Sequence, residues 1–576
     1  NVTNTKNSEK VNPVCHINGE ITTSYLYYKS GVCGTATNAT EVSAEALASG
    51  EVAWLLNGST AEGDVAWYQN LSENADAYPV LDSSHGKVYG SYVGCDSLLL
   101  YYSNNPLPTS LEHNYDAYGF CSNCGSFQPA TLISEGNYEI ANAGQLYWFA
   151  EKVNKGENIN GRLTADIVVN EEVLTADGKL NGDRTRFKMW TPIGNMYYNG
   201  TFDGQGHTIS GLVLMDNTAL YIGLFQINAS RGIIKNVGLV DSYFYANIYT
   251  GGICGRNDGT VENCFNAAKC IANKYSGGIV GGNNGGSIAN CYNIGIIDGD
   301  GYISGICAYN SGSVSNSYYL EETADAGIGY GSGSGTTTAK TAEQFASGEV
   351  AWLLNGSEAG ESPAWRQTIG EDKYPVLDAA SGIVIHTTPT SLNSIVRPTA
   401  GTLVGVSDVY NFAGIEGKKV YGIPQTGTLA AAHPYVFTTN CEYVSFVPSD
   451  EDVTDNTETC GLTGVLDPAG VKVYGKDNTA GADVSIVFTA DALKYANPNG
   501  NTVKYGKCYI DAGQCFISSV PAMASKIASA FEDGVDGLEN VSIDSVEGET
   551  YNLQGIPVGD NYKGFIIQNG RKLLRR

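Results

Sequence analysis

Residues 251–320 decide the fold of this chain. They read GGICGRNDGTVENCFNAAKCIANKYS (251–276), GGIVGGNNGGSIANCYNIGIIDGDGYI (277–303) and SGICAYNSGSVSNSYYL (304–320), with Gly, Asn, Cys and branched aliphatic residues recurring about every 26 residues. Repeats of this length are typical of stacked units that gain a core only by stacking on one another. The segments between Gly and Asn are long enough for strands and too short for helices. The pattern predicts a parallel β-solenoid.

One column of asparagines marks a recurring corner of the predicted coil. Its members are 27, 27 and 26 residues apart. Asparagine tolerates left-handed backbone dihedrals, and stacked amides can bond to one another along the coil axis. A leucine-rich repeat has a similar period, but its leucine spacing is missing here. The column consists of Asn236, Asn263, Asn290 and Asn316.

Less regular coils are expected to open the solenoid between 163 and 214. They are preceded by ANAGQLYWFAEKVN (141–154), whose apolar residues, Leu146, Phe149 and Val153 among them, fall on one helical face. Asn142 is a suitable N-cap for such a helix. Because an open coil exposes apolar core and unpaired backbone, we expect this helix to cap it.

A longer repeat encloses the solenoid. AEALASGEVAWLLNGSTAEGDVAW (44–67) recurs as AEQFASGEVAWLLNGSEAGESPAW (342–365), 298 residues later. Each copy, which we call a tryptophan box, has amphipathic helical spacing, so core or cap packing is expected of its tryptophans rather than ligand stacking. The segment GEITTSYLYY before the first copy resembles the end of the solenoid, so the chain is expected to begin in the tail of an upstream solenoid module. The tryptophans are Trp54, Trp67, Trp352 and Trp365.

The remaining chain reads as antiparallel β structure. From about residue 391, runs such as KKVYGI, PYVFTT and VSIVFT alternate with Gly, Pro, Asn and Asp, which favours a sandwich. The expected class is therefore mainly all-β, with a parallel β-helix, short helical caps and a C-terminal β-sandwich. The expected organisation is an upstream solenoid tail (1–40), a tryptophan-box module (41–90), a cysteine-containing linker (91–130), the capped β-helix (131–322), a second tryptophan-box module (323–390), the sandwich (391–534) and a small β tail (535–576).

Composition limits the classes of partner. The net charge of −27 argues against nucleic acid and against anionic lipid, because both require clustered Lys and Arg. No apolar run approaches the roughly 18 residues of a membrane helix. Abundant Gly and Tyr (71 and 37 residues) with 16% charged residues are unusual for a cytosolic enzyme. A protein outside the cell fits better.

The repeats resemble a known family. GGICGRNDGTVENCFN and GGIVGGNNGGSIANCYN resemble the GLUG motif of bacterial extracellular proteins, and NAGQLYWFAEKVN, LTADI, WTPIG and FDGQGHTISGL are similar to the run that precedes it. The resemblance covers 131–320. It implies a right-handed parallel β-helix on secreted or surface proteins, including adhesin-like proteins and, as an accessory, IgA-specific metallopeptidases.

The C-terminal region carries a second resemblance. Residues 391–576 resemble C-terminal modules of secreted Bacteroidales proteins. YNLQGIPV (551–558) followed by KGFIIQNGRKLL (563–574) is similar to the tails associated with type IX sorting. Both resemblances imply an extracellular or outer cell-surface location.

Two places have spacings that suit a metal. His113, Cys121 and Cys124 form a CxxC knuckle with a nearby His, which suits zinc if a fourth ligand such as Cys95 is added. A local disulfide or thiols are the alternative. Asp298 and neighbouring Asp300 suggest calcium, but the further oxygen ligands of a calcium loop are absent, so a solvated turn is favoured.

The other cysteines read as packing residues. Cys264 and Cys291 share one column on adjacent coils, whereas Cys254 and Cys307 share another two coils apart, too far for a disulfide. Small buried apolar side chains are expected at both columns. The sequence leaves open a disulfide between Cys508 and Cys515 and another between Cys441 and Cys460.

No catalytic motif is present. The six histidines start no HExxH pattern, and neither a GxSxG elbow nor a phosphate loop occurs. A polysaccharide lyase or hydrolase remains the alternative, since parallel β-helices host such enzymes with carboxylates that no linear motif reveals. The carboxylates available for it are Asp166, Asp183, Asp203 and Asp241.

The sequence therefore predicts a non-enzymatic, adhesin-like or structural protein that displays a binding face. Tyrosines give large contact area at low entropic cost, which suits a surface protein or glycan of a host or a bacterium as the partner. A subunit of a larger surface assembly or filament is the alternative. The predicted face consists of Tyr243, Tyr245, Tyr249, Tyr275, Tyr292 and Tyr302.

Overall fold

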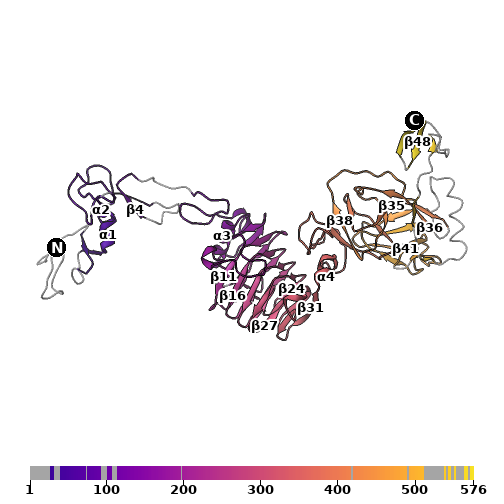
Figure 1. Ribbon diagram of the computed structural model, residues 1–576, viewed down its shortest axis with the longest axis horizontal. Helices are drawn as coiled ribbons and strands as arrows, with labels where there is room; N and C mark the ends of the chain where they lie inside the picture. Colours follow the sequence, from indigo (N-terminus) through magenta and orange to yellow (C-terminus); the bar gives the residue numbers. More distant parts are fainter. Residues whose placement is uncertain are drawn as a thin grey trace. The chain divides into compact units, whose positions relative to one another are not determined.

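A computed structural model describes residues 26–31, 39–72, 74–92, 100–106, 113–195, 197–416, 419–489 and 492–511, and five short strands beyond residue 536. The chain divides into two compact units, Asn1–Gln128 and Pro129–Arg576. The structure is mainly β, with a parallel solenoid and additional, mostly antiparallel sheets toward the C-terminus, so the predicted fold class is confirmed (Figure 1).

The solenoid is built from five columns of short strands that pair in parallel from one coil to the next. Its first column is β9 (Thr201–Asp203), β14 (Ile233–Lys235), β19 (Thr260–Glu262), β24 (Ser287–Ala289) and β29 (Ser313–Leu320); its second is β8 (Ile167–Val168), β10 (Thr208–Ser210), β15 (Gly238–Val240), β20 (Phe265–Asn266) and β25 (Tyr292–Asn293). The third is β11 (Val213–Asp216), β16 (Tyr243–Ala246), β21 (Lys269–Ala272) and β26 (Ile297–Gly299); the fourth is β12 (Tyr221–Ile222), β17 (Tyr249–Gly251), β22 (Tyr275–Gly277) and β27 (Tyr302–Ser304). The fifth is β13 (Phe225–Asn228), β18 (Cys254–Asn257), β23 (Val280–Asn283), β28 (Cys307–Asn310) and β30 (Ile328–Tyr330).

The repeat period fixes which residues stack. Ile234 pairs with Val261, Val261 with Ile288 and Ile288 with Val314, and all four are buried in the coil interior. This is the core that a single coil cannot form alone.

The asparagine corners behave as the sequence predicts. The four residues of the column have φ angles of 54°, 50°, 54° and 42°, in the left-handed region. The Asn263 side-chain amide donates to Asn236 Oδ1 at 3.1 Å, and that of Asn316 donates to Asn290 Oδ1 at 3.3 Å.

A second set of stacked amides lies inside the coil, where the sequence analysis did not identify it. We call it the interior amide ladder: it consists of Asn228, Asn257, Asn283 and Asn310, the last residues of β13, β18, β23 and β28. Each amide donates to the next along the axis, at 2.8, 2.9 and 2.9 Å. At most 1% of any of these residues is exposed, so each amide depends on its neighbours for hydrogen bonds.

Helix α3 (Ala143–Asn154) covers the first coils, as predicted (Figure 1). Its N-cap Asn142 accepts from the Gln145 N–H at 2.9 Å. Its buried face packs Phe149 against Tyr198 and Phe202. Strands β5 (Thr131–Ser134), β6 (Asn137–Ile140) and β7 (Asn160–Leu163) join it to the first column, and at the other end β31 (Ser334–Lys340) pairs with β29.

The two tryptophan boxes fold alike. Helices α1 (Ala44–Ala48) and α2 (Glu51–Leu56) correspond to α4 (Ala342–Ala346) and α5 (Glu349–Leu354). In each box an asparagine side chain forms two hydrogen bonds with the backbone of a tryptophan. Asn57 bonds to Trp67 and Asn355 to Trp365, at 2.7–3.1 Å. The first unit also contains β1 (Tyr27–Lys29), β2 (Thr40–Val42), β3 (Tyr89–Tyr92) and β4 (Leu100–Ser103).

The second box packs on the side of the solenoid. Trp365 is fully buried, contacts Phe265 and Tyr292 of the second column, and donates its indole N–H to Asn290 O at 3.0 Å. Trp67, the corresponding residue of the first box, is half-buried. Packing is therefore the role of Trp365, as the sequence predicts.

The C-terminal sheets form three layers, where the sequence suggests two. A central sheet buries Val436 and Phe412 toward one neighbour and Tyr435 and Phe437 toward the other. Alternating side chains of a strand point to opposite faces, so both faces of this sheet are covered. The central sheet is β33 (Leu392–Ile395), β37 (Tyr435–Thr438), β35 (Asp408–Glu416), β36 (Lys419–Gln425) and β46 (Ile543–Ser545).

The flanking layers are β32 (Ile383–His386), β38 (Tyr443–Pro448) and β34 (Gly401–Val404) on one side, and β39 (Leu462–Gly464), β44 (Cys508–Asp511), β41 (Ser485–Phe488), β42 (Ala492–Tyr495) and β45 (Gly537–Glu539) on the other. A two-stranded pair, β40 (Val471–Val473) and β43 (Asn501–Val503), adjoins them. The tail strands β47 (Tyr551–Asn552), β48 (Gly564–Gln568) and β49 (Arg571–Arg575) form an antiparallel sheet.

Candidate functional site

The fourth column of the solenoid carries a row of stacked tyrosines on its outer side. Neighbouring ring centroids are 5.2, 4.6, 5.4 and 5.4 Å apart, and the first three pairs are stacked within 21° of parallel. Lys274 Nζ lies 5.1 Å from the centroid of the Tyr275 ring. We call this row the tyrosine ladder: it consists of Tyr221, Tyr249, Tyr275 and Tyr302 on the fourth column, and of Tyr330, the last residue of β30 in the fifth column, whose ring lies against that of Tyr302.

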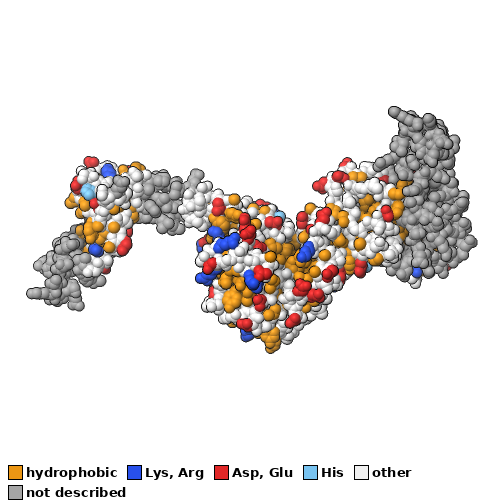
Figure 2. Space-filling view, viewed as in Figure 1, with side chains coloured by type: hydrophobic (Ala, Val, Ile, Leu, Met, Phe, Trp, Pro, Cys, Tyr) orange, Lys and Arg blue, Asp and Glu red, His pale blue; other side chains and the backbone are white. Residues whose placement is uncertain are grey.

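The ladder has both an exposed end and unused polar groups. Tyr302 and Tyr330 are 45% and 55% exposed. Within the described residues, the hydroxyl groups of Tyr249, Tyr275 and Tyr302 have no hydrogen-bond partner, although Tyr275 is only 7% exposed. Burial raises the pKa of Tyr249, which keeps its hydroxyl protonated and able to donate. Figure 2 shows hydrophobic side chains gathered on the solenoid surface among positive and negative ones.

The six tyrosines predicted to form one binding face lie in three different places. Tyr249, Tyr275 and Tyr302 lie in the ladder, whereas Tyr243 and Tyr245 lie on β16 in the third column. Tyr292 does not belong to the binding face, and that prediction is wrong. Its ring is covered by the second tryptophan box, and its hydroxyl donates to Pro375 O at 2.6 Å.

Two ladder residues escaped the sequence analysis. Tyr221 lies 28 residues before Tyr249 and pairs with it, whereas Tyr330 lies 28 residues after Tyr302 but pairs with Tyr309 of the fifth column. They lie beyond the regular blocks. Extending the fourth column by one coil before Tyr249 would have found Tyr221, whereas Tyr330 joins the ladder through a ring contact that the repeat does not reveal.

The four carboxylates weighed for a polysaccharide-cleaving enzyme each accept a backbone N–H. Asp166 accepts from Thr208 at 2.7 Å, Asp183 from Thr185 at 2.9 Å and Asp203 from Gln205 at 3.0 Å. Asp241 accepts from Val173 and Leu174 at 2.9 and 2.8 Å. These hydrogen bonds stabilise turns and join neighbouring coils, so each of the four carboxylates has a structural role.

The metal-like spacing does bring its residues together. His113, Cys121 and Cys124 each offer a ligand atom, and these atoms lie within 4.8 Å of one another, so the set, which we call the thiol cluster, can hold one ion. Cys121 lies on a tight hairpin whose turn is closed by the Gly125 N–H donating to Cys121 O at 2.7 Å. The proposed fourth ligand, Cys95, lies outside the described residues.

The surroundings of Cys121 favour the thiolate form of its side chain. Burial raises the pKa of its thiol, but hydrogen bonds from His113 and from the backbone of Asn123, Cys124 and Asn114 outweigh burial and lower the pKa to about 6. The thiolate is the metal-binding form of cysteine, so the group is ready for zinc at neutral pH.

We expect zinc to bind the full chain through the thiol cluster. Competition with a chromophoric chelator should show one zinc site. Cys124→Ser should lower the zinc affinity by at least ~10–100-fold, because losing even a residue that only hydrogen-bonds to a metal ligand lowers affinity by this much. Cys441→Ser is the control, because Cys441 is exposed and outside the cluster. Equal zinc affinity in the Cys124→Ser and control proteins would rule the cluster out.

At the other metal-like pair one carboxylate forms an ion pair, and the cysteine columns have packing roles. Asp298 pairs with Lys269 at 3.5 Å. Cys264 and Cys291 are buried thiols on adjacent coils, and Cys254 and Cys307 align through Val280 between them, as predicted.

Neither open disulfide is formed between described residues. Cys441 and Cys460 are both free. Cys508 is a buried free thiol, and Cys515 lies outside the described residues.

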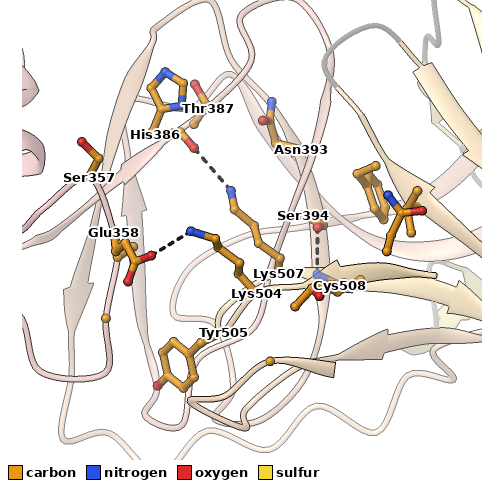
Figure 3. Close-up of a pocket in the computed structure, with 18 of the residues that line it drawn as sticks. Ser357, Glu358, His386, Thr387, Asn393, Ser394, Lys504, Tyr505, Lys507 and Cys508 are labelled. Carbon is orange, nitrogen blue, oxygen red and sulfur yellow. Dashed lines mark hydrogen bonds and ion pairs between the residues drawn. The ribbon is translucent and has the colours of Figure 1, made fainter. Parts of the chain in front are cut away.

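A cleft of about 720 Å³ lies where the second tryptophan box meets the C-terminal sheets (Figure 3). Its walls come from the loop around Glu358, the end of β32 at His386, strand β33, and the segment that joins β43 to β44. Lys504 and Lys507 extend into it side by side from that segment. Nothing in the repeat pattern pointed to this cleft.

Comparisons with known proteins give partial similarities. No family model matches the chain. It is 30% identical over 152 residues to Halomucin of Haloquadratum walsbyi, over 26% of this chain and 2% of that protein. It is 30% identical over 79 residues to a "Putative Gly-rich membrane protein" of Evansella cellulosilytica, over 13% of this chain and 9% of that protein. These short spans carry no activity or partner over to this chain.

One solved structure is also similar in part. A crystal structure from Bacteroides ovatus, described as that of "a putative immunoglobulin A1 protease", is 20% identical, with a TM-score of 0.29 over 44% of this chain and 96% of that one. Among the described residues, no helix is long and apolar enough to cross a membrane.

Proposed function

We propose that this chain is a non-enzymatic, secreted or cell-surface protein whose β-helix displays the tyrosine ladder to a glycan. The ladder is the observation that carries the proposal. It presents a row of ring edges and hydroxyl groups, spaced by 4.6–5.4 Å along the coil axis, that matches an extended polymer with a regular repeat. Sugars offer both hydroxyl groups for the phenols and apolar ring faces for the exposed end of the ladder.

The location outside the cell is part of the proposal. It is supported by the net charge of −27, which keeps a protein soluble, and by the GLUG-like and Bacteroidales-like resemblances of 131–320 and 391–576. The structural use of the four candidate carboxylates supports a binding role over a catalytic one.

The double substitution Tyr249→Ala with Tyr302→Ala is expected to weaken glycan binding by about 10-fold or more. Each aromatic contact is worth ~0.5–1.5 kcal/mol, and about 1.4 kcal/mol is tenfold in affinity. The measurement is a glycan array probed with the full chain, followed by titration with the glycans that bind. Tyr197→Ala is the control, since Tyr197 is 58% exposed and outside the ladder.

Three results would contradict the proposal. The double variant and the control could bind equally well. Binding to cells could survive periodate oxidation of their glycans and be lost on protease treatment, which would make the partner a protein. Incubation with polysaccharides could release reducing or unsaturated ends, which would make the chain an enzyme.

A further inference from the structure

The cleft beside the second tryptophan box contains two lysines, and only one of them has an acidic partner. Lys504 Nζ pairs with Glu358 at 2.7 Å. Lys507 Nζ, by contrast, reaches only the carbonyl oxygen of His386, at 3.3 Å, and among the described residues no carboxylate lies within ion-pair distance of it (Figure 3). Glu358 and Glu361 also line the cleft, but neither forms an ion pair with Lys507.

A third cation lies behind the wall of the cleft. Arg397 is only 4% exposed, and its guanidinium donates to Ala359 O and Gly360 O at 3.1 and 3.3 Å. Its Nε and Nη2 groups have no hydrogen-bond partner among the described residues. The guanidinium carbon lies 5.5 Å from the centroid of the Tyr505 ring, which lines the cleft.

Such an arrangement is costly without an anion. Burying a charge costs several kcal/mol unless it is paired; Arg397 is buried, and Lys507 is half-buried. Burial lowers the pKa of Lys507, and although Cys508 opposes the effect, nearby Arg397 adds to it. Among the described residues, Glu358 pairs with Lys504 and no carboxylate pairs with Lys507. A bound anion would supply Lys507 with a partner.

The other walls indicate the rest of the ligand. Trp352 and His386 stack at 5.7 Å and 26°, so one side of the cleft is aromatic. The cleft is within the usual size of a small-molecule site, ~300–1,000 Å³. A cleft lined by aromatic side chains and by ammonium groups suits a sugar ring that carries a carboxylate.

We propose that this cleft binds an acidic sugar, with the sugar carboxylate on Lys507 and Lys504 and the ring against Trp352 and His386. The site is separate from the tyrosine ladder and does not depend on the function proposed for it. It gives the C-terminal module a recognition role of its own.

The test is isothermal titration calorimetry of the full chain with glucuronate, glucose and inorganic phosphate. Glucuronate is expected to bind, whereas glucose and phosphate bind at least ~10-fold more weakly, because the site needs both the charge and the ring. Lys507→Met should weaken glucuronate binding by about 10-fold or more, since hydrogen bonds to charged groups are worth ~1.5–3 kcal/mol. Lys472→Met, an exposed lysine on β40, is the control and should bind as the unchanged protein does.

The selectivity of the unchanged protein does not depend on any variant folding. Equal affinity for glucuronate and glucose, equal affinity for glucuronate and phosphate, or no binding of glucuronate would each overturn the proposal. So would unaltered glucuronate binding in both Lys507→Met and Lys504→Met. Thermal unfolding of each variant checks that its fold is retained.

Discussion

Replacing Asn257 with leucine is expected to lower the free energy of unfolding of the solenoid by about 3–6 kcal/mol, because several buried groups lose their partners at ~1–3 kcal/mol each. The Asn257 amide donates to Asn283 at 2.9 Å and to Gly259 O at 3.2 Å. Its Oδ1 accepts from Asn228 at 2.8 Å. Leucine has a similar size but offers none of these bonds, and the position is fully buried.

The exposed amide pair on the outside of the same coil provides the control. Asn273 donates to Asn247 at 3.2 Å, and its side chain is exposed to water. Asn273→Ala should change stability by no more than about 0.5 kcal/mol. Chemical unfolding of both variants, followed by circular dichroism, makes the comparison. Similar small effects at the two positions would mean that the interior amide ladder does not hold the coils together.

Replacing Trp365 with alanine is expected to cost about 3–5 kcal/mol, the range for removing a large buried aromatic side chain. The indole fills the contact between the second tryptophan box and the solenoid, against Phe265 and Tyr292. Its loss also removes the hydrogen bond to Asn290 O and leaves the Tyr292 ring partly uncovered. The box should then detach readily, which limited proteolysis between 341 and 382 would detect.

The first tryptophan box contains the matched control. Trp67 has the same local hydrogen bonds as Trp365 but is only half-buried. Trp67→Ala should therefore destabilise its own unit by clearly less, about 1–2 kcal/mol, because less apolar area returns to water. If both substitutions cost the same, Trp365 stabilises its box alone and the packing of the box on the solenoid contributes little.

The repeat pattern predicts the coil well because the period and the structure have the same cause. Asn236, Asn263 and Asn290 recur at constant spacing, and their side-chain amides can bond to one another only when consecutive coils stack in register. The cap helix was predictable for a similar reason, because its apolar face and Asn142 N-cap are both local signals. The similar folds of the two tryptophan boxes were predictable because their sequences are largely identical.

What the sequence did not reveal depends on contacts between distant segments. Tyr292 has the pattern of an outward tyrosine, yet a box more than fifty residues later in the chain covers it. The cleft combines Glu358, His386 and Lys507, which no short motif links. The sequence analysis missed the interior amide ladder because asparagine is a common corner residue. Only the structure shows that the asparagines ending β18 and β23 are buried in the core.

The measurement that tests the central claim most directly is hydroxyl-radical footprinting of the full chain with and without a glycan that it binds. The account predicts that Tyr249, Tyr302 and Tyr330 become protected, while Tyr197 on another part of the surface is labelled to the same extent in both samples. Unchanged labelling of the three ladder tyrosines at saturating glycan would contradict it.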